Sequence, residues 1–322
     1  MKNYLNRYMA TCVPGMESVL ADEIRNANNI SISRGKVTFD CECPEMLKCA
    51  DNLYKLYRLF PIGPHKTDLE NIGKLLRDID FGVSGSIIVS ASRSGKHTYS
   101  RFDIAEQIES LLVSTGKFTV GDNLNHDLAI RVDVSDDICT IYKQLTSAQM
   151  RFRGEDFQSA PGGIRPSLAH CLVRLSEPKN DDVFYDPFCG AGTIPFERAA
   201  YKSRKIYASD YDETVLETAR INLGTSAIVF SADATKTKMK DHSVNKVVTN
   251  MPWGKQIKLD DGLYCNFILE LKRILTPDGK AIILTDQVSA IEKLCGEQNL
   301  NCSRITELSL HGLYPVVFLI AF

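Results

Sequence analysis

Short apolar runs and helix-like segments alternate along the second half of the chain. The apolar runs predict strands at residues 182–186, 205–209, 227–231, 244–250, 280–285, 302–308 and 316–321. Between them, apolar residues three or four positions apart predict helices at residues 167–175, 193–200, 212–223 and 264–275. Such alternation is typical of βαβ units, so this half is predicted to form a mostly parallel α/β sheet. The last two strands are joined by a turn too short for a helix, which predicts an antiparallel hairpin and a mixed sheet.

The first half has a less regular order of elements. Its apolar pattern predicts strands at residues 7–12, 36–41, 86–92, 127–133 and 138–143, and helices at residues 17–26, 44–58, 69–77 and 103–114. The turn residues Pro61 to Pro64 predict a linker between two small α+β modules. A chain of 322 residues exceeds the usual size of one domain, so more than one domain is expected.

The composition, with 44% hydrophobic and 24% charged residues, is that of a globular protein and excludes disorder and fibrous repeats. The 38 basic and 40 acidic residues give a net charge of -2. A uniformly basic surface for nucleic acid is therefore excluded, and any polyanion site must be a local patch. The longest apolar stretch, residues 313–322, is about half of what a bilayer requires, so no membrane partner is expected.

The ten cysteines are scattered along the chain, and the closest pair is Cys41 and Cys43. No Cys-x-x-Cys pair and no close pair of histidines occurs. Because no targeting segment is recognised either, we expect reduced thiols, a cytoplasmic location and no metal site.

The first candidate site lies at the end of the first strand of the α/β half. Residues 186–193 read Asp-Pro-Phe-Cys-Gly-Ala-Gly-Thr, with glycines at a turn between a strand and a helix. Glycines at such a turn let a ligand approach the backbone closely. The third glycine of a dinucleotide fingerprint is missing, since Pro195 stands in its place. Asp186 would repel a pyrophosphate but suits a cation such as the amine of a methionine group, which disfavours a dehydrogenase.

Carboxylates recur at the ends of the next two strands. Asp210 follows the second strand, where it suits a ribose diol, and Asp233 follows the third, where it suits an adenine amine. Parallel strands bring their carboxyl ends to one edge of the sheet, so the three acids together predict a nucleoside cofactor there. The cofactor implied is S-adenosylmethionine, with S-adenosylhomocysteine as product. The predicted cofactor-binding residues are Pro166, Asp186, Pro187, Phe188, Gly190, Gly192, Thr193, Asp210, Tyr211, Asp233, Ala234 and Asn250.

The fourth strand runs into a tetrapeptide that contains the chain's only tryptophan. Its sequence is Asn250-Met251-Pro252-Trp253. The Asn250 side-chain oxygen and the Met251 carbonyl could accept the two hydrogens of an amine, and Trp253 offers a face for stacking. Since the segment lies at the same sheet edge as the predicted methyl donor, its four residues are the predicted catalytic residues.

These segments resemble those of a known family. The tetrapeptide is similar to the Asn/Asp-Pro-Pro-Tyr motif of amino-group methyltransferases, with Met251 in place of the first proline and Trp253 in place of the tyrosine. Together with residues 186–193 it resembles the RNA methylases that modify guanine N2. Residues 9–17 resemble the start of the ferredoxin-like module of these enzymes, and residues 93–100 resemble the RNA-binding THUMP domain.

The resemblance implies a fold and a function for nearly the whole chain. It implies a ferredoxin-like module at residues 1–62, a THUMP domain at 63–148, a linker at 149–165 and a Rossmann-like class I methyltransferase domain at 166–322. The TrmN-type tRNA (guanine-N2)-methyltransferases are the nearest group, which implies methylation of guanosine 6 in the acceptor stem of tRNA. The sequence does not indicate whether a partner protein is required.

Two stretches without acidic residues, 81–102 and 138–154, carry basic and aromatic side chains. In a chain of slightly negative net charge they predict phosphate contact and base stacking. Arg165, in the segment that flanks the cofactor pocket in this family, is a further candidate. The predicted RNA-binding residues are Arg93, Lys96, His97, Tyr99, Arg101, Lys143, Arg151, Arg153 and Arg165.

Other functions stay open at this point. The tetrapeptide would also suit ribosomal RNA guanine N2, adenine N6 in DNA or RNA, or a protein glutamine as methyl acceptor. Only the RNA-binding first half of the chain argues against adenine N6 and glutamine. A non-catalytic RNA-binding protein is a further alternative, which the acids at three strand ends and Asn250 disfavour.

Overall fold

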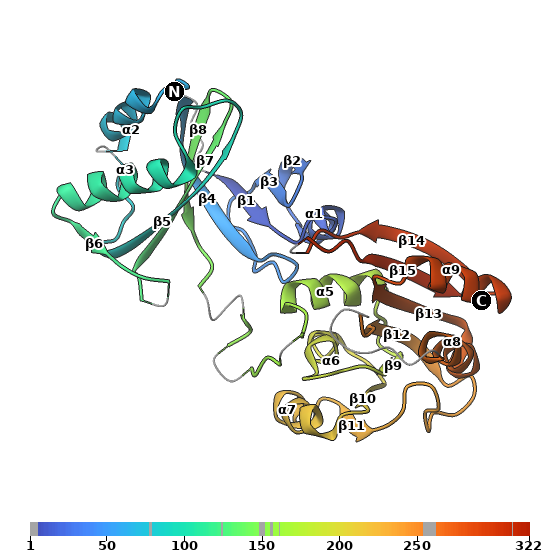
Figure 1. Ribbon diagram of the computed structural model, residues 1–322. Coiled ribbons are helices and arrows are strands. Elements are labelled where there is room, and N and C mark those ends of the chain that lie inside the picture. Colours follow the sequence, from blue (N-terminus) through green and yellow to red (C-terminus); the bar gives the residue numbers. More distant parts are fainter. Residues whose placement is uncertain are drawn as a thin grey trace.

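Two β-sheets organise the part of the chain that the structure describes (Figure 1). The computed structural model describes residues 6–76, 79–123, 125–147, 152–154, 157–160, 162–253, 262–310 and 312–322. None of the helices in these ranges has the length and apolar character that a membrane-spanning helix needs. All ten cysteines are free thiols, as expected.

The first sheet has eight strands in the order β2-β3-β1-β4-β8-β7-β5-β6. They are β1 (Arg7–Thr11), β2 (Asn28–Ser33), β3 (Lys36–Asp40), β4 (Asn52–Pro61), β5 (Gly85–Ser94), β6 (Phe118–Val120), β7 (Leu128–Ser135) and β8 (Ile138–Gln144). The helices of this half are α1 (Glu17–Glu23), the short 3-10 helix η1 (Lys66–Asp68), α2 (Leu69–Leu76) and α3 (Arg101–Ser114). Antiparallel pairing of β4 with β8 makes one continuous sheet of the two predicted α+β modules.

The helix predicted at residues 44–58 is wrong, because the second part of this segment is strand β4. This strand lies between β1 and β8, and apolar side chains on both of its faces are buried. Leu53 belongs to one core cluster, Tyr54 and Leu56 to a second, and Phe60 to a third. A strand that is packed on both faces loses the period-two alternation that distinguishes it from a helix. Strands β2 and β6 were not predicted either.

The second sheet has seven strands in the order β11-β10-β9-β12-β13-β15-β14. They are β9 (Val183–Asp186), β10 (Lys205–Asp210), β11 (Ile228–Ser231), β12 (Val244–Asn250), β13 (Leu275–Thr285), β14 (Asn301–Glu307) and β15 (Val316–Ala321). The pairs from β11 to β13 are parallel, and β15 is antiparallel to both β13 and β14. The predicted mixed α/β sheet with an antiparallel hairpin is therefore confirmed.

Helices cover both faces of the second sheet. They are α5 (Pro166–Leu175), α6 (Thr193–Arg198), α7 (Glu213–Leu223), α8 (Leu263–Ile274) and α9 (Val288–Glu297), of which α9 was not predicted. Helices α8 and α9 share a core cluster with one face of β12, β13 and β15. Helix α5 packs against the other face, through Val248, Ile282 and Val317 among others. We call this part, residues 162–322, the α/β domain.

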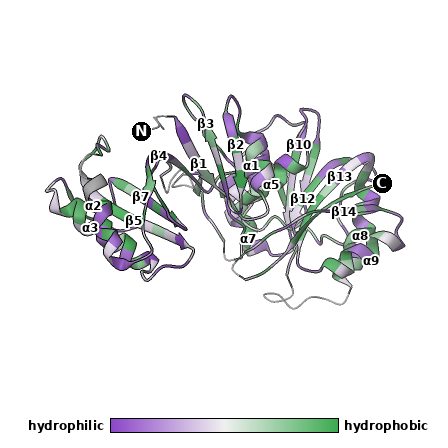
Figure 2. Cartoon of the chain, turned by 90° about the horizontal axis from the view of Figure 1, so that it is seen from above, coloured by the Kyte–Doolittle hydropathy of each residue, from purple (hydrophilic) through white to green (hydrophobic). Residues whose placement is uncertain are grey.

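The N-terminal module, made of β1–β3 and α1, shares a hydrophobic core with the α/β domain. One cluster contains Leu20 and Phe39 of the module together with Leu172 and Leu284 of the α/β domain. By contrast, β5–β8 with α2 and α3 surround a separate cluster, and we call this part the α2–α3 lobe. In the view from above, the α2–α3 lobe and the α/β domain lie at opposite ends of the molecule, with the N-terminal module between them (Figure 2). The module is therefore packed onto the α/β domain, beside its carboxyl sheet edge.

Candidate active site

The carboxyl ends of four neighbouring strands bring the predicted site residues together. Asp186 ends β9, Asp210 ends β10, Asp233 follows β11 by two residues, and Asn250 ends β12. The register pairs Ala208 with Asp186 and Asp210 with Ser231, so these ends lie at one edge of the sheet. The sequence-based prediction that these residues meet at one edge is thus borne out by the topology.

The glycine turn after β9 combines an open position with a closely packed one. Both Gly190 and Gly192 have positive φ, +52° and +85°, a region that favours glycine. A Cβ on Gly192 would lie 2.9 Å from Leu223 Cδ1, so this glycine lets the turn pack against α7. A Cβ on Gly190 would meet no atom within 4 Å among the described residues, so the space beside this glycine is open to a ligand. Thr193 then begins α6 and is buried.

Asp186 is completely buried and keeps one oxygen unpaired. Its Oδ1 accepts hydrogen bonds from the Thr249 hydroxyl at 2.7 Å and from the Phe188 amide at 3.2 Å. Its Oδ2 has no hydrogen-bond partner among the described residues. Burial raises the pKa of Asp186 to about 7, and the charge of Asp210 acts in the same direction. Buried polar groups are rarely left unpaired without a functional reason, so this oxygen suits a cationic ligand group.

The carboxylate of Asp210 ties the glycine turn to the end of β10. Its Oδ2 accepts from the Gly190 amide at 2.9 Å, and its Oδ1 accepts from the Asp212 amide at 3.1 Å. Tyr211, between these acids, is 83% exposed and therefore available for contact with a ligand.

The segment after β11 has a similar local arrangement. Asp233 Oδ1 accepts from both the amide and the hydroxyl of Thr235, at 2.8 and 2.7 Å, which fixes the turn. The neighbouring Ala234 is 4% exposed and contacts the core beneath α8. Asp233 itself is exposed at the sheet edge.

The predicted catalytic tetrapeptide is held by its backbone. The Met251 amide donates to the Leu284 carbonyl at 3.0 Å, and the Met251 side chain is completely buried in the core. The Pro252 carbonyl accepts a 2.6 Å hydrogen bond from the Tyr264 hydroxyl. Trp253 packs against the cluster shared with the N-terminal module.

Two polar atoms of this tetrapeptide are buried and lack partners. They are Asn250 Oδ1, an acceptor, and Trp253 Nε1, a donor, and neither has a hydrogen bond among the described residues. An unpaired acceptor at the carboxyl edge is the feature that a site for an exocyclic amine requires.

Pro166 and Arg165 lie where the N-terminal module meets the α/β domain. Pro166 is the first residue of α5 and is buried. Arg165 forms an ion pair with Asp51 at 3.0 Å, and the Ser167 hydroxyl donates to the same carboxylate at 2.6 Å. The predicted RNA-binding residue Arg165 thus also contributes to the contact between the two parts.

Arg153 also lies between the N-terminal module and the α/β domain, and its burial corrects the prediction that it binds RNA. Its side chain is 10% exposed, pairs with Glu197 at 2.6 Å and donates to the Lys48 carbonyl at 2.7 Å. Because the guanidinium is buried between two parts of the protein, we assign Arg153 to this contact rather than to RNA. Arg151, the neighbouring candidate, lies outside the described residues.

The candidates of the α2–α3 lobe divide into exposed and buried residues. Arg93, Lys96 and Arg101 are exposed near the end of β5 and the start of α3. Tyr99 is 2% exposed and donates to the Gly63 carbonyl, so its ring belongs to the core and is not available for base stacking.

The other two candidates of this lobe are occupied by backbone contacts. His97 Nε2 lies 2.6 Å from the Asp136 carbonyl, and Lys143 donates to the Phe81 carbonyl at 2.8 Å. Counting charges along an acid-free stretch does not tell which side chains point outward, which explains why Tyr99 was misassigned.

One group of potential metal ligands occurs among the described residues. Ligand atoms of Glu23, Cys49 and His170 lie within 4.8 Å of one another at the contact between module and α/β domain. Glu23 accepts from the Lys48 and Cys49 amides, and His170 contacts Glu197 at 2.8 Å and the Tyr201 hydroxyl at 2.9 Å. These contacts account for the group as part of the packing between the two parts, and the expected absence of a metal stays a prediction.

The fold and this edge of carboxylates define a Rossmann-like enzyme that uses S-adenosylmethionine to methylate another molecule. Comparison with protein families agrees: the RMKL-like methyltransferase domain matches residues 153–315, half of the chain, and the RlmL ferredoxin-like domain matches residues 7–53. The chain therefore belongs to the RMKL-like methyltransferase family, and S-adenosylmethionine is its methyl donor.

Curated relatives and solved structures extend the similarity to the whole chain. A tRNA (guanine(6)-N2)-methyltransferase of Archaeoglobus fulgidus is 24% identical, over 99% of this chain and 93% of the relative. One of Thermus thermophilus with the same name is 29% identical, over 74% of this chain and 72% of the relative. The crystal structure of TrmN from Thermus thermophilus has the same fold, with a TM-score of 0.84 at 23% identity over 98% of this chain and 99% of that one.

Proposed function

We propose that this protein transfers a methyl group from S-adenosylmethionine to the exocyclic N2 amine of guanosine 6 in the acceptor stem of tRNA. The proposed substrate follows from the names of the two relatives, both tRNA (guanine(6)-N2)-methyltransferases. The similarity to this chain covers most of the length of each relative. The observation that carries the chemistry is the buried, unpaired Asn250 Oδ1 at the carboxyl edge of the sheet, beside the donor site.

The donor fits the residues at this edge. Asp186 Oδ2 would accept from the ammonium group of the methionine part, because it is a buried acceptor without a partner. Asp210 and Tyr211 would contact the ribose, and Asp233 and Ala234 the adenine. The open space beside Gly190 lets the donor approach the turn formed by residues 187–193. When bound, S-adenosylmethionine supplies a methyl group on a positively charged sulfur.

The tetrapeptide would hold the methyl acceptor. The lone pair of guanine N2 is delocalised into the ring, so this nitrogen is a poor nucleophile. Asn250 Oδ1 and the Met251 carbonyl would accept both of its hydrogens and stabilise the positive charge that develops on nitrogen. Trp253 would fix the plane of the base, so much of the rate enhancement comes from positioning.

Two further features belong to this proposal. A paired guanosine would have to be flipped out of the stem to reach the tetrapeptide. The exposed cations Arg93, Lys96 and Arg101 would contact the phosphates of tRNA from the α2–α3 lobe. We also propose the domain boundaries that the resemblance implies: a ferredoxin-like module at 1–62, a THUMP domain at 63–148, a linker at 149–165 and a methyltransferase domain at 166–322. A cytoplasmic location is likewise proposed.

The test is incubation of the protein with unmodified tRNA and labelled S-adenosylmethionine, followed by nucleoside mass analysis and mapping. We expect N2-methylguanosine at position 6. Label in adenine N6, in ribosomal RNA alone or in protein alone would contradict the substrate while leaving the methyltransferase family intact.

A further inference from the structure

Helix α8 carries three buried side chains that each contact a different loop of the active site. They are Tyr264, Phe267 and Glu270, which are 8%, 1% and 7% exposed. Residues three positions apart lie on the same face of a helix, so these side chains form one row along α8. With a rise of about 1.5 Å per residue, the row is about 9 Å long.

The first contact fixes the tetrapeptide that would hold the acceptor amine. The Tyr264 hydroxyl donates to the Pro252 carbonyl at 2.6 Å and lies 3.2 Å from the Thr285 hydroxyl. Pro252 has no amide hydrogen to anchor it, so the Tyr264 contact restrains the backbone between Met251 and Trp253.

The second contact fixes the glycine turn. The ring of Phe267 packs against the ring of Phe188 with a centroid distance of 5.2 Å and an interplanar angle of 69°. Phe188 is also the residue whose amide donates to Asp186, so the helix contacts the segment that would lie beside the methionine part of the proposed donor.

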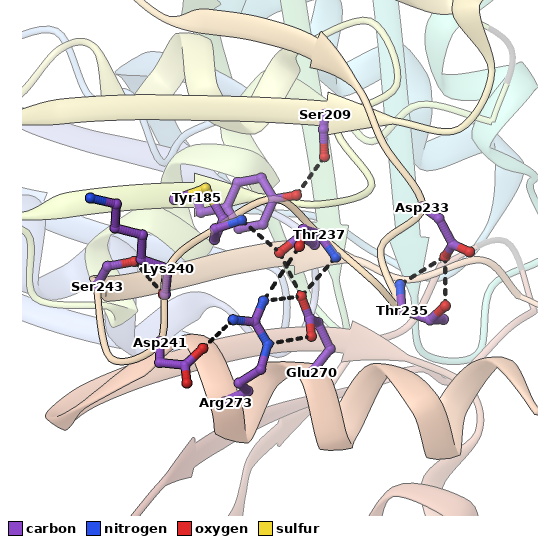
Figure 3. A network of polar contacts seen from close by, with 11 residues as sticks. Tyr185, Ser209, Asp233, Thr235, Thr237, Lys240, Asp241, Ser243, Glu270 and Arg273 are labelled. Carbon is purple, nitrogen blue, oxygen red and sulfur yellow. Dashed lines mark hydrogen bonds and ion pairs between the residues drawn. The ribbon is translucent and has the colours of Figure 1, made fainter.

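The third contact fixes the loop between β11 and β12, which carries Asp233 and Ala234 (Figure 3). Glu270 Oε1 accepts from the Thr237 amide at 2.7 Å and from the Thr237 hydroxyl at 2.6 Å. Arg273, on the same side of α8, donates to both oxygens of Glu270 at 2.6 and 2.8 Å and also pairs with Asp241 further along the loop.

The pair of Glu270 and Arg273 therefore holds the loop at two points. The hydrogen bonds and the neighbouring arginine keep the pKa of Glu270 below its ordinary value despite burial, so the carboxylate is ionised when it contacts the loop. A charged acceptor makes stronger hydrogen bonds than a neutral one, which restrains Thr237 three residues after Ala234.

From this row of contacts we propose that α8 positions both ligands of the enzyme through two separate residues: Glu270 the adenosine end of the donor, and Tyr264 the acceptor amine. This inference rests on the proposed function. Neither side chain touches a ligand in this scheme, so both are positioning residues. The scheme requires that substitutions at the two residues affect different steps.

The Glu270 part is tested by calorimetry with S-adenosylhomocysteine, which needs no RNA. Glu270→Met keeps the volume but removes both acceptors, and we expect binding to weaken about tenfold. Glu270→Gln keeps an acceptor and should restore binding to within about threefold of the unsubstituted protein. At saturating donor, kcat should stay unchanged in both variants.

The Tyr264 part is tested with Tyr264→Phe, which removes the hydroxyl and keeps the ring. We expect kcat to fall about tenfold with S-adenosylhomocysteine binding unchanged. Trp253 is the chain's only tryptophan, so its fluorescence reports on the tetrapeptide without any RNA. The emission should shift in Tyr264→Phe and stay unchanged in Glu270→Met.

Asp182→Asn is the matched control for a purely structural effect. Asp182 is 3% exposed, pairs with the buried Arg198 and lies before β9, at the opposite end of the strand from the site. The Asp182→Asn substitution should lower the melting temperature without changing ligand binding or tryptophan emission.

The proposal is overturned if Glu270→Met binds S-adenosylhomocysteine like the unsubstituted protein, or if Tyr264→Phe leaves both emission and kcat unchanged. If the unsubstituted protein binds S-adenosylhomocysteine but methylates no tRNA, the proposed function fails, while binding and emission still decide this inference.

Discussion

The hydroxyl of Thr249 donates a 2.7 Å hydrogen bond to Asp186 Oδ1, with both residues completely buried at the carboxyl edge of the second sheet. This bond and the Phe188 amide satisfy one oxygen of the carboxylate, and the other stays unpaired. The pKa of Asp186 is raised by burial to about 7. The group is thus ready to change its charge near neutral pH, and this gives the donor site a predictable pH dependence.

We expect the affinity for S-adenosylhomocysteine to rise with pH up to about 7, the pKa of Asp186, because in the proposed site only the ionised carboxylate attracts the ligand's ammonium group. Below this value the affinity should fall up to about tenfold per pH unit. In Asp186→Asn the affinity should be low at every pH. Thr249→Val removes a hydrogen bond that favours the ionised carboxylate and should move the midpoint to higher pH. Calorimetry between pH 5 and pH 8 measures both effects, and a midpoint unaffected by Thr249→Val would contradict the assignment.

The same group affects the stability of the ligand-free protein. Its folded pKa of about 7 lies above the ordinary value of 3.8, so the folded state holds an extra proton between these values. The contribution of Asp186 to the free energy of unfolding is therefore largest at low pH, falls as pH rises through this window and is lowest above about 7. The difference in unfolding free energy between the unsubstituted protein and Asp186→Asn should decrease correspondingly from pH 4 to pH 8.

The two glycines of the turn after β9 should respond differently to the same substitution. In Gly190→Ala the new methyl group enters open space, so the fold should lose only about 1–2 kcal/mol for the positive φ, while donor binding is blocked. In Gly192→Ala the methyl group meets Leu223, so the loss of stability should be larger. Chemical unfolding and S-adenosylhomocysteine titration of both variants measure this contrast. Unimpaired ligand binding by Gly190→Ala would mean that the donor does not approach this turn.

Asn250→Ala should impair methyl transfer to tRNA much more than binding of the donor. In the proposed function Asp186, Asp210 and Asp233 make the main contacts with the donor and Asn250 a lesser one, so the affinity for S-adenosylhomocysteine should stay within about threefold. Methylation of tRNA should fall by about two to three orders of magnitude, because an acceptor for the amine hydrogens is lost in the transition state. Turnover at the unsubstituted rate would end the assignment of Asn250 to the acceptor amine.

The position of the proposed donor site follows from a general rule of topology. Asp186, Asp210 and Asn250 end parallel strands, and such ends meet at one edge whatever the details of packing. The contacts of Tyr264 and Glu270 could not be predicted in this way, because their partners depend on how α8 is rotated against the sheet. Helical periodicity marks a buried face but does not tell which loop lies opposite it.

Errors in the first half have a related cause. Strand β4 was predicted as part of a helix since its two faces belong to different clusters and both are apolar. Tyr99 and Arg153 were assigned to RNA from the charge of their neighbours. In the structure the Tyr99 hydroxyl donates to the Gly63 carbonyl, and Arg153 forms an ion pair with Glu197. In each case a long-range contact decides where the side chain points.

Binding of tRNA should depend weakly on salt. The exposed cations near the end of β5 are Arg93, Lys96 and Arg101, and a few phosphate contacts give a slope of about -1 each for log affinity against log salt. We expect a total slope of about -3, reduced by about one in Arg93→Ala or Lys96→Ala. Lys293→Ala on α9 is the control and should leave the slope unchanged. A slope steeper than about -6 would show that more of the surface contacts RNA.

The contact between the N-terminal module and the α/β domain depends on Gly15. The Thr306 hydroxyl donates to the Gly15 carbonyl at 2.9 Å, and a Cβ on Gly15 would clash with the Glu307 carbonyl oxygen. Gly35 is a matched control, because it too has a positive φ but a Cβ there would meet its nearest atom at 3.5 Å.

Gly35→Ala should cost about 1–2 kcal/mol from the backbone alone. Gly15→Ala has the same type of backbone strain and must also push β14 away from the module, so we expect an additional loss of about 2 kcal/mol. Urea unfolding of both variants gives the difference. Because module and α/β domain share one core, Gly15→Ala should lower the midpoint of the whole shared unit. Equal losses in the two variants, or a new early transition confined to the α2–α3 lobe, would contradict this account of how the module is attached.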